Sequence, residues 1–296
     1  MNDVVEIAIN NSAFPPLLKQ IHTPPQKLYV RGNVAALQNE NTLAVVGSRA
    51  ANTYGQQACA LLLPAVVRAG VVLVSGLAHG IDSLAHRACV DEDRPTIAVL
   101  GSGPDDNSIY PHTNTKLVRR IVEAGGAVVT EYPPGTKARR GQFPFRNRII
   151  VGLSRAVLLI QAAKRSGSLI TTRLAAEENR DVLAVPGMLT SELSFGPNQL
   201  IKNGAALVTT SEDILAALGF DSTPAGEETS SDVQPALLLT SDQQNILNQL
   251  SDQPTHLDTI AEKTSLSAHH TSATLIELEL AGHIQNVGGM RYIRKI

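Results

Sequence analysis

Residues 43–86 decide the fold, and they read LAVVGSRAANTYGQQACALLLPAVVRAGVVLVSGLAHGIDSLAH. This stretch contains the same unit twice: a short apolar run, a turn with glycine and a segment of helix length. Continuous apolar runs are typical of strands buried on both faces, which occur in parallel sheets covered by helices. The stretch therefore predicts a doubly wound α/β fold with a mostly parallel sheet.

The same unit continues along the chain to residue 185. The apolar runs that predict strands lie at 43–47, 71–75, 96–100, 127–130, 156–160 and 182–185. Helices fit between these runs at about 53–69, 80–91, 113–124, 146–153 and 168–179. We therefore expect the main domain at residues 41–220.

The segments on either side of this domain differ from it in composition. Residues 1–40 form a lead segment whose prolines disfavour long helices, and we expect it to pack on the main domain. Residues 221–237 are small, polar and acidic, which predicts a flexible linker. Residues 238–296 contain three segments of helical periodicity and a ribbon pattern around Gly288-Gly289. This last pattern predicts a small C-terminal winged-helix domain.

Charge is distributed unevenly over the 296 residues, whose net charge is −2. Residues 211–296 carry 12 acidic and 4 basic side chains, whereas residues 1–210 carry 15 acidic and 21 basic ones. Residues 132–176 contain no acidic residue, and nine Lys and Arg lie there with Phe143 and Phe145. Cations that follow phosphates, beside rings on which bases stack, suit a single-stranded nucleic acid. A solvated charged face is the alternative, although such faces usually mix both signs.

The turns after the strands are expected to form one ligand surface, because doubly wound sheets bind ligands beyond the carboxyl ends of their strands. The Gly47-Ser48-Arg49 and Ser166-Gly167-Ser168 turns are candidate phosphate cradles. Glycine lets the backbone approach a ligand, and a helix start favours anions. For each turn alone a purely structural role is an equal alternative, since tight turns also use Gly and Ser.

Rival classes of site are poorly supported. The G-x-G-x-x-G fingerprint of dinucleotide enzymes does not follow the first strand, and the sequence has no G-x-x-x-x-G-K-[ST] motif of P-loop NTPases. The spacing of His79, Asp82 and His86 would allow a metal site. However, His79 precedes the predicted helix and Asp82 suits its N-terminus, so capping or packing is favoured.

The sequence indicates a cytoplasmic protein without membrane contact. Cys59 and Cys89 are the only cysteines, and residues 1–11 have neither the basic nor the apolar region of a secretory leader. No apolar run approaches the ~18 residues that a membrane span requires.

Taken together, the motifs resemble the DNA-processing protein A family, also called DprA or Smf. The resemblance spans residues 15–218, and its motifs are VVGSRAANTYG (45–55), SGLAHGIDSLAH (75–86), AVLGSGPDDNSIYPHTN (98–114), TEYPPGT (130–136), FPFRNRIIVGLS (143–154), SGSLITTRLAAEENRDVLAVPG (166–187) and GPNQLIKNGAALV (196–208). It implies an extended Rossmann-like domain that binds single-stranded DNA without sequence preference. It also implies that the protein protects incoming strands in natural transformation and helps to load the RecA recombinase. We further expect a homodimer that has no cofactor, metal or enzymatic activity.

The resemblance also assigns candidate site residues. The family's DNA pocket falls on Arg49, Arg140 and Phe143. With the turn residues and the flanking motif residues, the candidate DNA-binding set is Gly47, Ser48, Arg49, Lys137, Arg140, Phe143, Arg146, Arg148, Ser166, Gly167 and Ser168. The sequence departs from the family at Gln161, where Glu is common, and at His79, where Arg is frequent.

Two functional hypotheses stay open at this point. The first is a single-strand DNA-binding mediator, and the second is a Rossmann-type enzyme acting on a nucleotide or a nucleotide-derived ligand. The acids near the turn surface do not assemble into a catalytic mechanism, which favours the mediator. In the predicted winged-helix domain, the recognition helix carries Glu277 and Glu279 and no Lys or Arg, so a protein contact or a structural role is favoured over duplex DNA.

Overall fold

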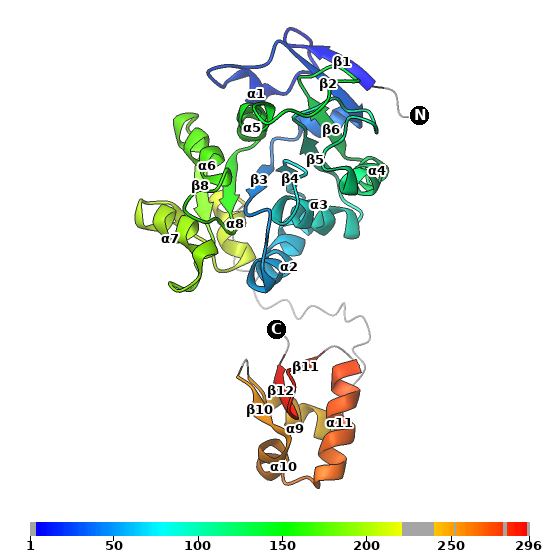
Figure 1. Ribbon diagram of the computed structural model, residues 1–296, viewed down its shortest axis with the longest axis vertical. Helices are drawn as coiled ribbons and strands as arrows, with labels where there is room; N and C mark the ends of the chain where they lie inside the picture. The colour runs from blue at the N-terminus through cyan, green and yellow to red at the C-terminus, as the bar shows by residue number, and fades with distance from the viewer. Residues whose placement is uncertain (1–3, 221–239, 252, 281–282, 295–296) are drawn as a thin grey trace. The chain divides into compact units, whose positions relative to one another are not determined.

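The computed structural model describes residues 4–220, 240–251, 253–280 and 283–294. Its contacts divide the chain into two compact units, Met1–Pro224 and Ala225–Ile296, each of which is described by itself (Figure 1). The predicted linker at 221–237 lies outside the described residues.

The first unit is built on a nine-stranded sheet with the order β1-β2-β6-β5-β4-β3-β7-β8-β9. The strands from β3 to β9 run parallel to one another, whereas β2 pairs antiparallel with β6 and β1 pairs antiparallel with β2. The strands are β1 (Val4–Ala8), β2 (Lys27–Gly32), β3 (Thr42–Val46), β4 (Val72–Ser75), β5 (Thr96–Val99), β6 (Ala127–Thr130), β7 (Ala156–Leu159), β8 (Asp181–Ala184) and β9 (Ala206–Leu207).

Helices cover both faces of this sheet (Figure 1). One face carries α2 (Thr53–Arg68), α3 (Ile81–Asp91), α4 (Thr115–Glu123) and α8 (Ser211–Ala217); the other carries α1 (Pro16–Lys19), α5 (Gln142–Gly152), α6 (Ser168–Glu177) and α7 (Phe195–Lys202). Short 3-10 turns lie at Val34–Gln38, His112–Asn114 and Glu192–Ser194.

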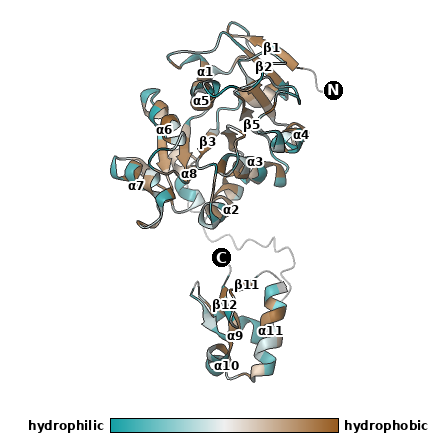
Figure 2. Ribbon diagram, viewed as in Figure 1, coloured by the Kyte–Doolittle hydropathy of each residue, from teal (hydrophilic) through white to brown (hydrophobic). Residues whose placement is uncertain are grey.

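The strands are apolar on both sides because each side faces a helix layer. Along β3, Leu43 and Val45 pack in the core with α2, whereas Ala44 and Val46 pack in the core with α5 and α6. Successive side chains of a strand point to opposite faces, so a continuous apolar run fills two cores. Figure 2 shows the hydrophobic residues along the strands of the sheet.

The predicted doubly wound fold is confirmed, and each predicted strand agrees with an observed one to within one residue at either end. The structure gives the lead segment at 1–40 a larger part than expected, because β1 and β2 extend the sheet. Helix α5 begins at Gln142, four residues before the predicted start, so Phe143 lies in its first turn. Pro144 is compatible with that turn, where the backbone N–H groups have no partner within the helix.

The strand order creates a switch point in the sheet. From the central strand β3 the chain builds β4, β5 and β6 on one side, and then continues with β7 and β8 on the other. In doubly wound sheets the connections diverge at such a point and leave a crevice beyond the carboxyl ends of the two strands. The turns after β3 and β7 therefore border the expected ligand crevice.

The second unit has the predicted winged-helix fold. It contains α9 (Ser241–Gln249), α10 (Leu257–Thr264) and α11 (Ala268–Leu280), with a small sheet in the order β10 (Thr255–His256), β12 (Arg291–Arg294), β11 (Ile284–Asn286). Its core includes Ile246, Ile260, Leu275 and Tyr292. Over the described parts of both units, no helix has the length and apolar character needed to cross a membrane.

Candidate nucleic-acid interface

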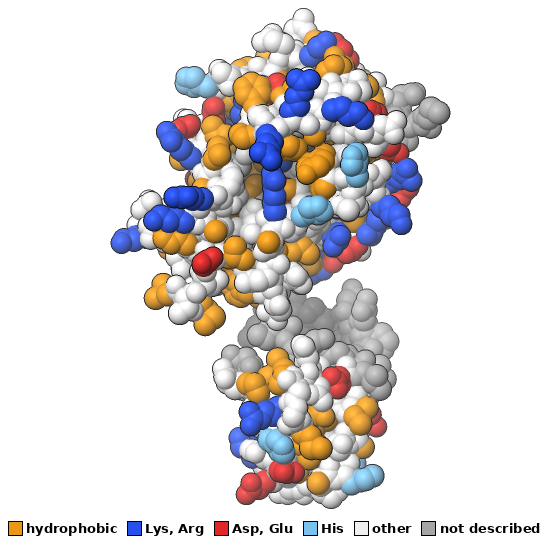
Figure 3. Space-filling view, in the orientation of Figure 1, with side chains coloured by type: hydrophobic (Ala, Val, Ile, Leu, Met, Phe, Trp, Pro, Cys, Tyr) orange, Lys and Arg blue, Asp and Glu red, His pale blue; other side chains and the backbone are white. Residues whose placement is uncertain are grey.

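A cavity of about 910 Å³ opens at the switch point of the sheet. Nine of the eleven candidate residues line it, namely Gly47, Ser48, Arg49, Arg140, Phe143, Arg146, Ser166, Gly167 and Ser168. Figure 3 shows Lys, Arg and hydrophobic side chains together across this face of the first unit. The turns after β3 and β7 and the start of α5 thus converge on one site, as the sequence predicted.

Two guanidinium groups lie near the ring of Phe143. The Cζ atom of Arg49 is 5.8 Å from the centroid of its ring, and that of Arg146 is 6.0 Å away. The ring packs close to the backbone of Gly101, where an added Cβ would lie 3.2 Å from Cδ1 of Phe143. Cations at these distances are attracted to an aromatic ring. The ring is therefore fixed in place, and it stays partly exposed to the cavity.

Arg146 forms part of the cavity floor. Its side chain is buried, and Nη1 donates to the carbonyl oxygens of Gly76, at 2.7 Å, and Val99. Burial lowers the pKa of Arg146 to about 10, so the guanidinium stays charged at neutral pH. Arg146 belongs to the candidate DNA-binding set and lines the cavity, but its Nε and Nη1 donors are used within the protein, so its main contribution is positive charge near Phe143.

Asp82 is the acidic partner of Arg146 within the protein. Among the described residues that line the cavity, Asp82 alone is acidic. Its carboxylate is buried and accepts a hydrogen bond from the backbone N–H of Ala78 at 3.3 Å. Burial raises the pKa of Asp82, and the charge of Arg146 opposes this effect. Gly76 makes room for the pair, because a Cβ there would lie 2.3 Å from Nη2 of Arg146 and 2.7 Å from the Asp82 carboxylate.

The exposed cations of the cavity are Arg49 and Arg140. Arg49 follows β3 and Arg140 precedes α5, so two turns of the carboxyl edge supply one charge each. On the β7 side, the Ser166 and Ser168 hydroxyls are 2.7 Å apart at the start of α6. The backbone N–H groups of Ser168, Leu169 and Ile170 donate within this turn, to Ser166 and Gly167. The cavity thus combines two exposed guanidinium groups, two serine hydroxyls and an aromatic ring.

Lys137 and Arg148 do not line the cavity. The Nζ atom of Lys137 donates to the carbonyl of Asn107 at 3.2 Å. Arg148 is buried, lies 2.6 Å from Glu131 in an ion pair and is covered by the ring of Phe145 at 4.2 Å. Burial raises the pKa of Glu131 despite this guanidinium. Arg148 therefore connects α5 to the end of β6, and the structure does not place it where the sequence predicted.

The three residues considered for a metal lie in different surroundings. Asp82 is used as described above, His79 is exposed, and Nδ1 of the buried His86 lies 2.9 Å from the Thr96 hydroxyl. Burial lowers the pKa of His86 to about 3. Across the described ranges, no group of three His, Cys, Asp or Glu side chains is arranged to hold a metal ion.

Gln161 supports the turn that carries Arg49. Its side-chain nitrogen donates to Oδ1 of Asn52 at 2.6 Å, and its oxygen accepts from the backbone N–H of Asn52 at 3.3 Å. Asn52 in turn caps α2 by accepting from the N–H of Gly55. Gln161, one of the two residues at which the sequence departs from the family pattern, thus holds the end of the β3 turn.

Tyr110 is a cavity residue that the sequence reasoning did not select. It lies in the loop between β5 and α4, lines the cavity and is 49% exposed. The available signal was a large aromatic residue before a proline, in a loop otherwise rich in Gly, Asp and Ser. That signal is weak, because exposed aromatic residues are common on protein surfaces.

The fold and the cavity define the class of protein: a Rossmann-like domain with a cationic, aromatic cavity at its switch point, followed by a winged helix. The sequence matches the family described as DNA recombination-mediator protein A over residues 6–219, and the DprA winged helix domain over residues 230–290. The chain therefore belongs to the DNA recombination-mediator protein A family.

Named relatives agree with this assignment. The chain is 40% identical to Protein Smf of Escherichia coli K12 over 295 residues, covering 97% of this chain and 76% of Smf. It is 41% identical to DNA processing protein DprA of Streptococcus pneumoniae over 213 residues, covering 72% of this chain and 74% of DprA.

Two solved structures are similar to the first unit. The X-ray structure of DprA from Streptococcus pneumoniae matches with a TM-score of 0.68 at 40% identity, covering 72% of this chain and 74% of that one. DNA processing protein A from Helicobacter pylori, solved for its single-stranded DNA binding mode, matches with a TM-score of 0.64 at 28% identity, covering 72% of this chain and 95% of that one.

Proposed function

We propose that the protein binds single-stranded DNA without sequence preference in the cavity at the switch point. The observation that carries the proposal is the partly exposed ring of Phe143, with the guanidinium groups of Arg49 and Arg146 5.8 and 6.0 Å from its centroid. A base can stack on the ring only when it is unpaired, and every base offers a π-face for stacking. The arrangement therefore favours a single strand over a duplex and gives no preference for one base.

The electrostatics of the cavity support the same proposal. Arg49 and Arg140 are exposed and line the cavity, and the charge of Arg146 lies 6.0 Å from the ring centroid. Phosphates on either side of a base stacked there would be attracted to these cations. The Helicobacter pylori relative, described by its single-stranded DNA binding mode, makes the same ligand reasonable for this chain.

We propose that the protein acts by binding and not by catalysis. The cavity's acidic residue, Asp82, is buried, accepts a backbone hydrogen bond and faces Arg146. A general acid or base must reach a substrate atom within hydrogen-bond distance, and this carboxylate is buried beside a backbone donor and the charge of Arg146. The second hypothesis, an enzyme acting on a nucleotide, has no further observation in its favour.

Membership of a recombination-mediator family supports the wider role. We propose that the protein, as a cytoplasmic homodimer, protects incoming single strands and loads the RecA recombinase on them during transformation or recombination. Binding without sequence preference suits this role, because incoming strands have no common sequence.

The test is a fluorescence-anisotropy titration of the full chain with a labelled oligonucleotide and with its matched duplex. At one salt concentration, the single strand should bind more tightly than the duplex. Equal affinity for the two would refute the proposal, because diffuse attraction to phosphates does not require an unpaired base.

A further inference from the structure

The loop between β5 and α4 exposes one aromatic ring between buried neighbours. Ser108, Ile109 and Pro111 are buried, whereas Tyr110 between them is 49% exposed and lines the cavity. Burying Ile109 and Pro111 anchors the backbone on both sides of Tyr110. The position of this ring beside the cavity is therefore set by the fold.

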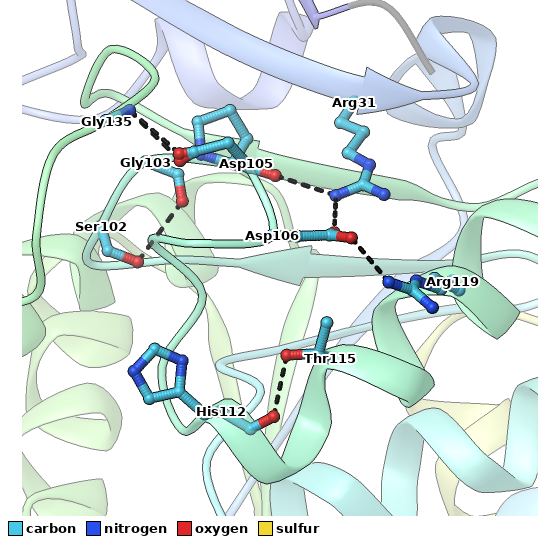
Figure 4. A network of polar contacts seen from close by, with 10 residues as sticks. Arg31, Ser102, Gly103, Asp105, Asp106, His112, Thr115, Arg119 and Gly135 are labelled. Carbon is cyan, nitrogen blue, oxygen red and sulfur yellow. Dashed lines mark hydrogen bonds and ion pairs between the residues drawn. The ribbon is translucent and has the colours of Figure 1, made fainter. Parts of the chain in front are cut away.

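Polar contacts fix the first half of this loop (Figure 4). The carboxylate of Asp105 accepts from the backbone N–H of Gly135 at 3.0 Å, which ties the loop to the segment that leads to α5. The carboxylate of Asp106 pairs with Arg31 on β2 at 2.5 Å and with Arg119 on α4 at 2.8 Å. Two neighbouring carboxylates thus connect the loop to three other parts of the first unit.

The second half of the loop is fixed as well. The side-chain nitrogen of Asn114 donates to the carbonyl of Leu77 at 2.8 Å and to the hydroxyl of Ser83 at 2.9 Å. The hydroxyl of Thr115 donates to the carbonyl of His112 at 2.8 Å (Figure 4). A backbone held by its surroundings loses little conformational freedom when the site binds a ligand, so the loop that carries Tyr110 is preorganised.

Tyr110 continues a row of rings that begins at Phe143. The ring centroids of Tyr110 and Phe143 are 5.7 Å apart at an interplanar angle of 51°, and those of Tyr110 and His112 are 6.4 Å apart at 76°. The rings are steeply inclined, so they are not stacked on one another in parallel. Because Tyr110 is 49% exposed, much of its ring is open to a planar ligand.

We propose that Tyr110, with His112 at its edge, forms a second base-stacking subsite for the unpaired nucleobase next to the one on Phe143. This inference rests on the proposed function and extends it by one nucleotide toward α4. Base–aromatic stacking does not depend on base identity, so the second subsite keeps binding independent of sequence. It acts through the base and not through a phosphate.

The proposal predicts a specific pattern for substitutions. Tyr110→Ala should weaken single-strand binding by between about 5- and 150-fold, the range for loss of one stacked base. Tyr110→Phe keeps the ring and should stay within about twofold of the parent chain. Neither substitution should change the slope of log affinity against log salt, because no phosphate contact is lost. Leu61→Ala is the control, since Leu61 is 59% exposed on α2 and does not line the cavity.

Abasic oligonucleotides separate a subsite from a support for Phe143. Anisotropy is measured with the full chain and the shortest oligothymidylate that the parent chain binds at full affinity, with one base removed at each position in turn. At one position, removal should weaken the parent chain but not Tyr110→Ala. At a neighbouring position, it should weaken both the parent chain and Tyr110→Ala but not Phe143→Ala. The subsite is refuted if Tyr110→Ala binds the intact oligonucleotide with full affinity. It is also refuted if each abasic position weakens binding by Tyr110→Ala as much as it weakens binding by the parent chain.

A cross-linking measurement needs no substitution. The protein is bound to an oligonucleotide that carries one 5-iodouridine, and the complex is illuminated. Light attaches the iodinated base to an aromatic ring beside it. For one position the cross-linked peptide should contain Tyr110 or His112, and for a neighbouring position it should contain Phe143. Cross-links that never include Tyr110 or His112, with Phe143 labelled, would refute the subsite alone. If the parent chain does not prefer the single strand and Phe143 is not labelled either, the proposed function itself fails.

Discussion

Replacing Arg49 by Ala should flatten the salt dependence of single-strand binding. Arg49 is exposed on the cavity rim, where a phosphate next to a base on Phe143 can reach it. Each phosphate neutralised on a single strand contributes roughly −0.7 to the slope of log affinity against log salt, because counterions are released. Loss of this one contact should therefore reduce the slope by about 0.7.

The expected change in slope determines the range of salt concentrations that the experiment must cover. When salt is raised from about 50 to about 200 mM, one contact of this kind changes the affinity by about 2.6-fold. The ratio of the parent chain's affinity to that of Arg49→Ala should therefore fall by the same factor over this range. Anisotropy titrations at four or more salt concentrations resolve such a slope. Arg140→Ala should behave in the same way, since Arg140 also lines the cavity.

Arg165 provides the matched control. It belongs to the same acid-free stretch and is exposed, but it does not line the cavity. Arg165→Ala should leave the slope nearly unchanged. Equal flattening by Arg49→Ala, Arg140→Ala and Arg165→Ala would refute the reasoning, because it would mean diffuse attraction to the whole basic face without a defined site.

Three further predictions concern other parts of the chain. Glu131→Gln should lower the unfolding free energy by about 3–5 kcal/mol, because it leaves the buried Arg148 charge unpaired. The affinity for a DNA strand should stay the same. A loss of affinity without a loss of stability would instead place Arg148 at the DNA. The pKa of His86 is about 3 in the folded state, so its stabilising contribution is full above pH 6.5 and is lost as the pH falls toward 3. Urea unfolding should lose about 2 kcal/mol between pH 7 and pH 5, and His86→Gln should lack this loss, whereas equal losses would contradict the assignment. Deleting residues 222–296 should leave strand affinity largely unchanged, because that part is net negative and α11 has no Lys or Arg, and a loss of most of the affinity would argue against it.

The parallel strands β3 to β8 could be predicted because each coincides with a short apolar run in the local sequence, whereas β9 has only two residues, both exposed, and was not predicted. The antiparallel strands β1 and β2 could not be predicted either. Only Ile7 of β1 is buried, so this edge strand lacks the continuous apolar run of the strands within the sheet. Their pairing joins residues far apart in the chain, such as Val4 with Arg31 and Tyr29 with Thr130. Prolines around them favoured an irregular segment instead.

The turns of the site that follow strands could be predicted from the sequence. The burial of side chains whose partners are distant in the sequence could not. The turns after β3 and β7 meet because parallel strands share a carboxyl edge. In the sequence, Arg146 and Arg148 resemble the other cations of one basic stretch. Their burial depends on the carbonyl of Gly76 and the carboxylate of Glu131, which no local pattern reveals.

Phe143→Ala tests the central claim most directly. The affinity of this variant for an oligonucleotide and for the matched duplex is compared with that of the parent chain at one salt concentration, with the melting temperature measured alongside. Stacking predicts a loss of about 1–3 kcal/mol for the single strand, a small change for the duplex and an intact fold, so that the preference for unpaired DNA largely disappears. Unchanged single-strand affinity with a lowered melting temperature would contradict the account, because Phe143 would then be a packing residue and the cavity would not bind DNA by stacking.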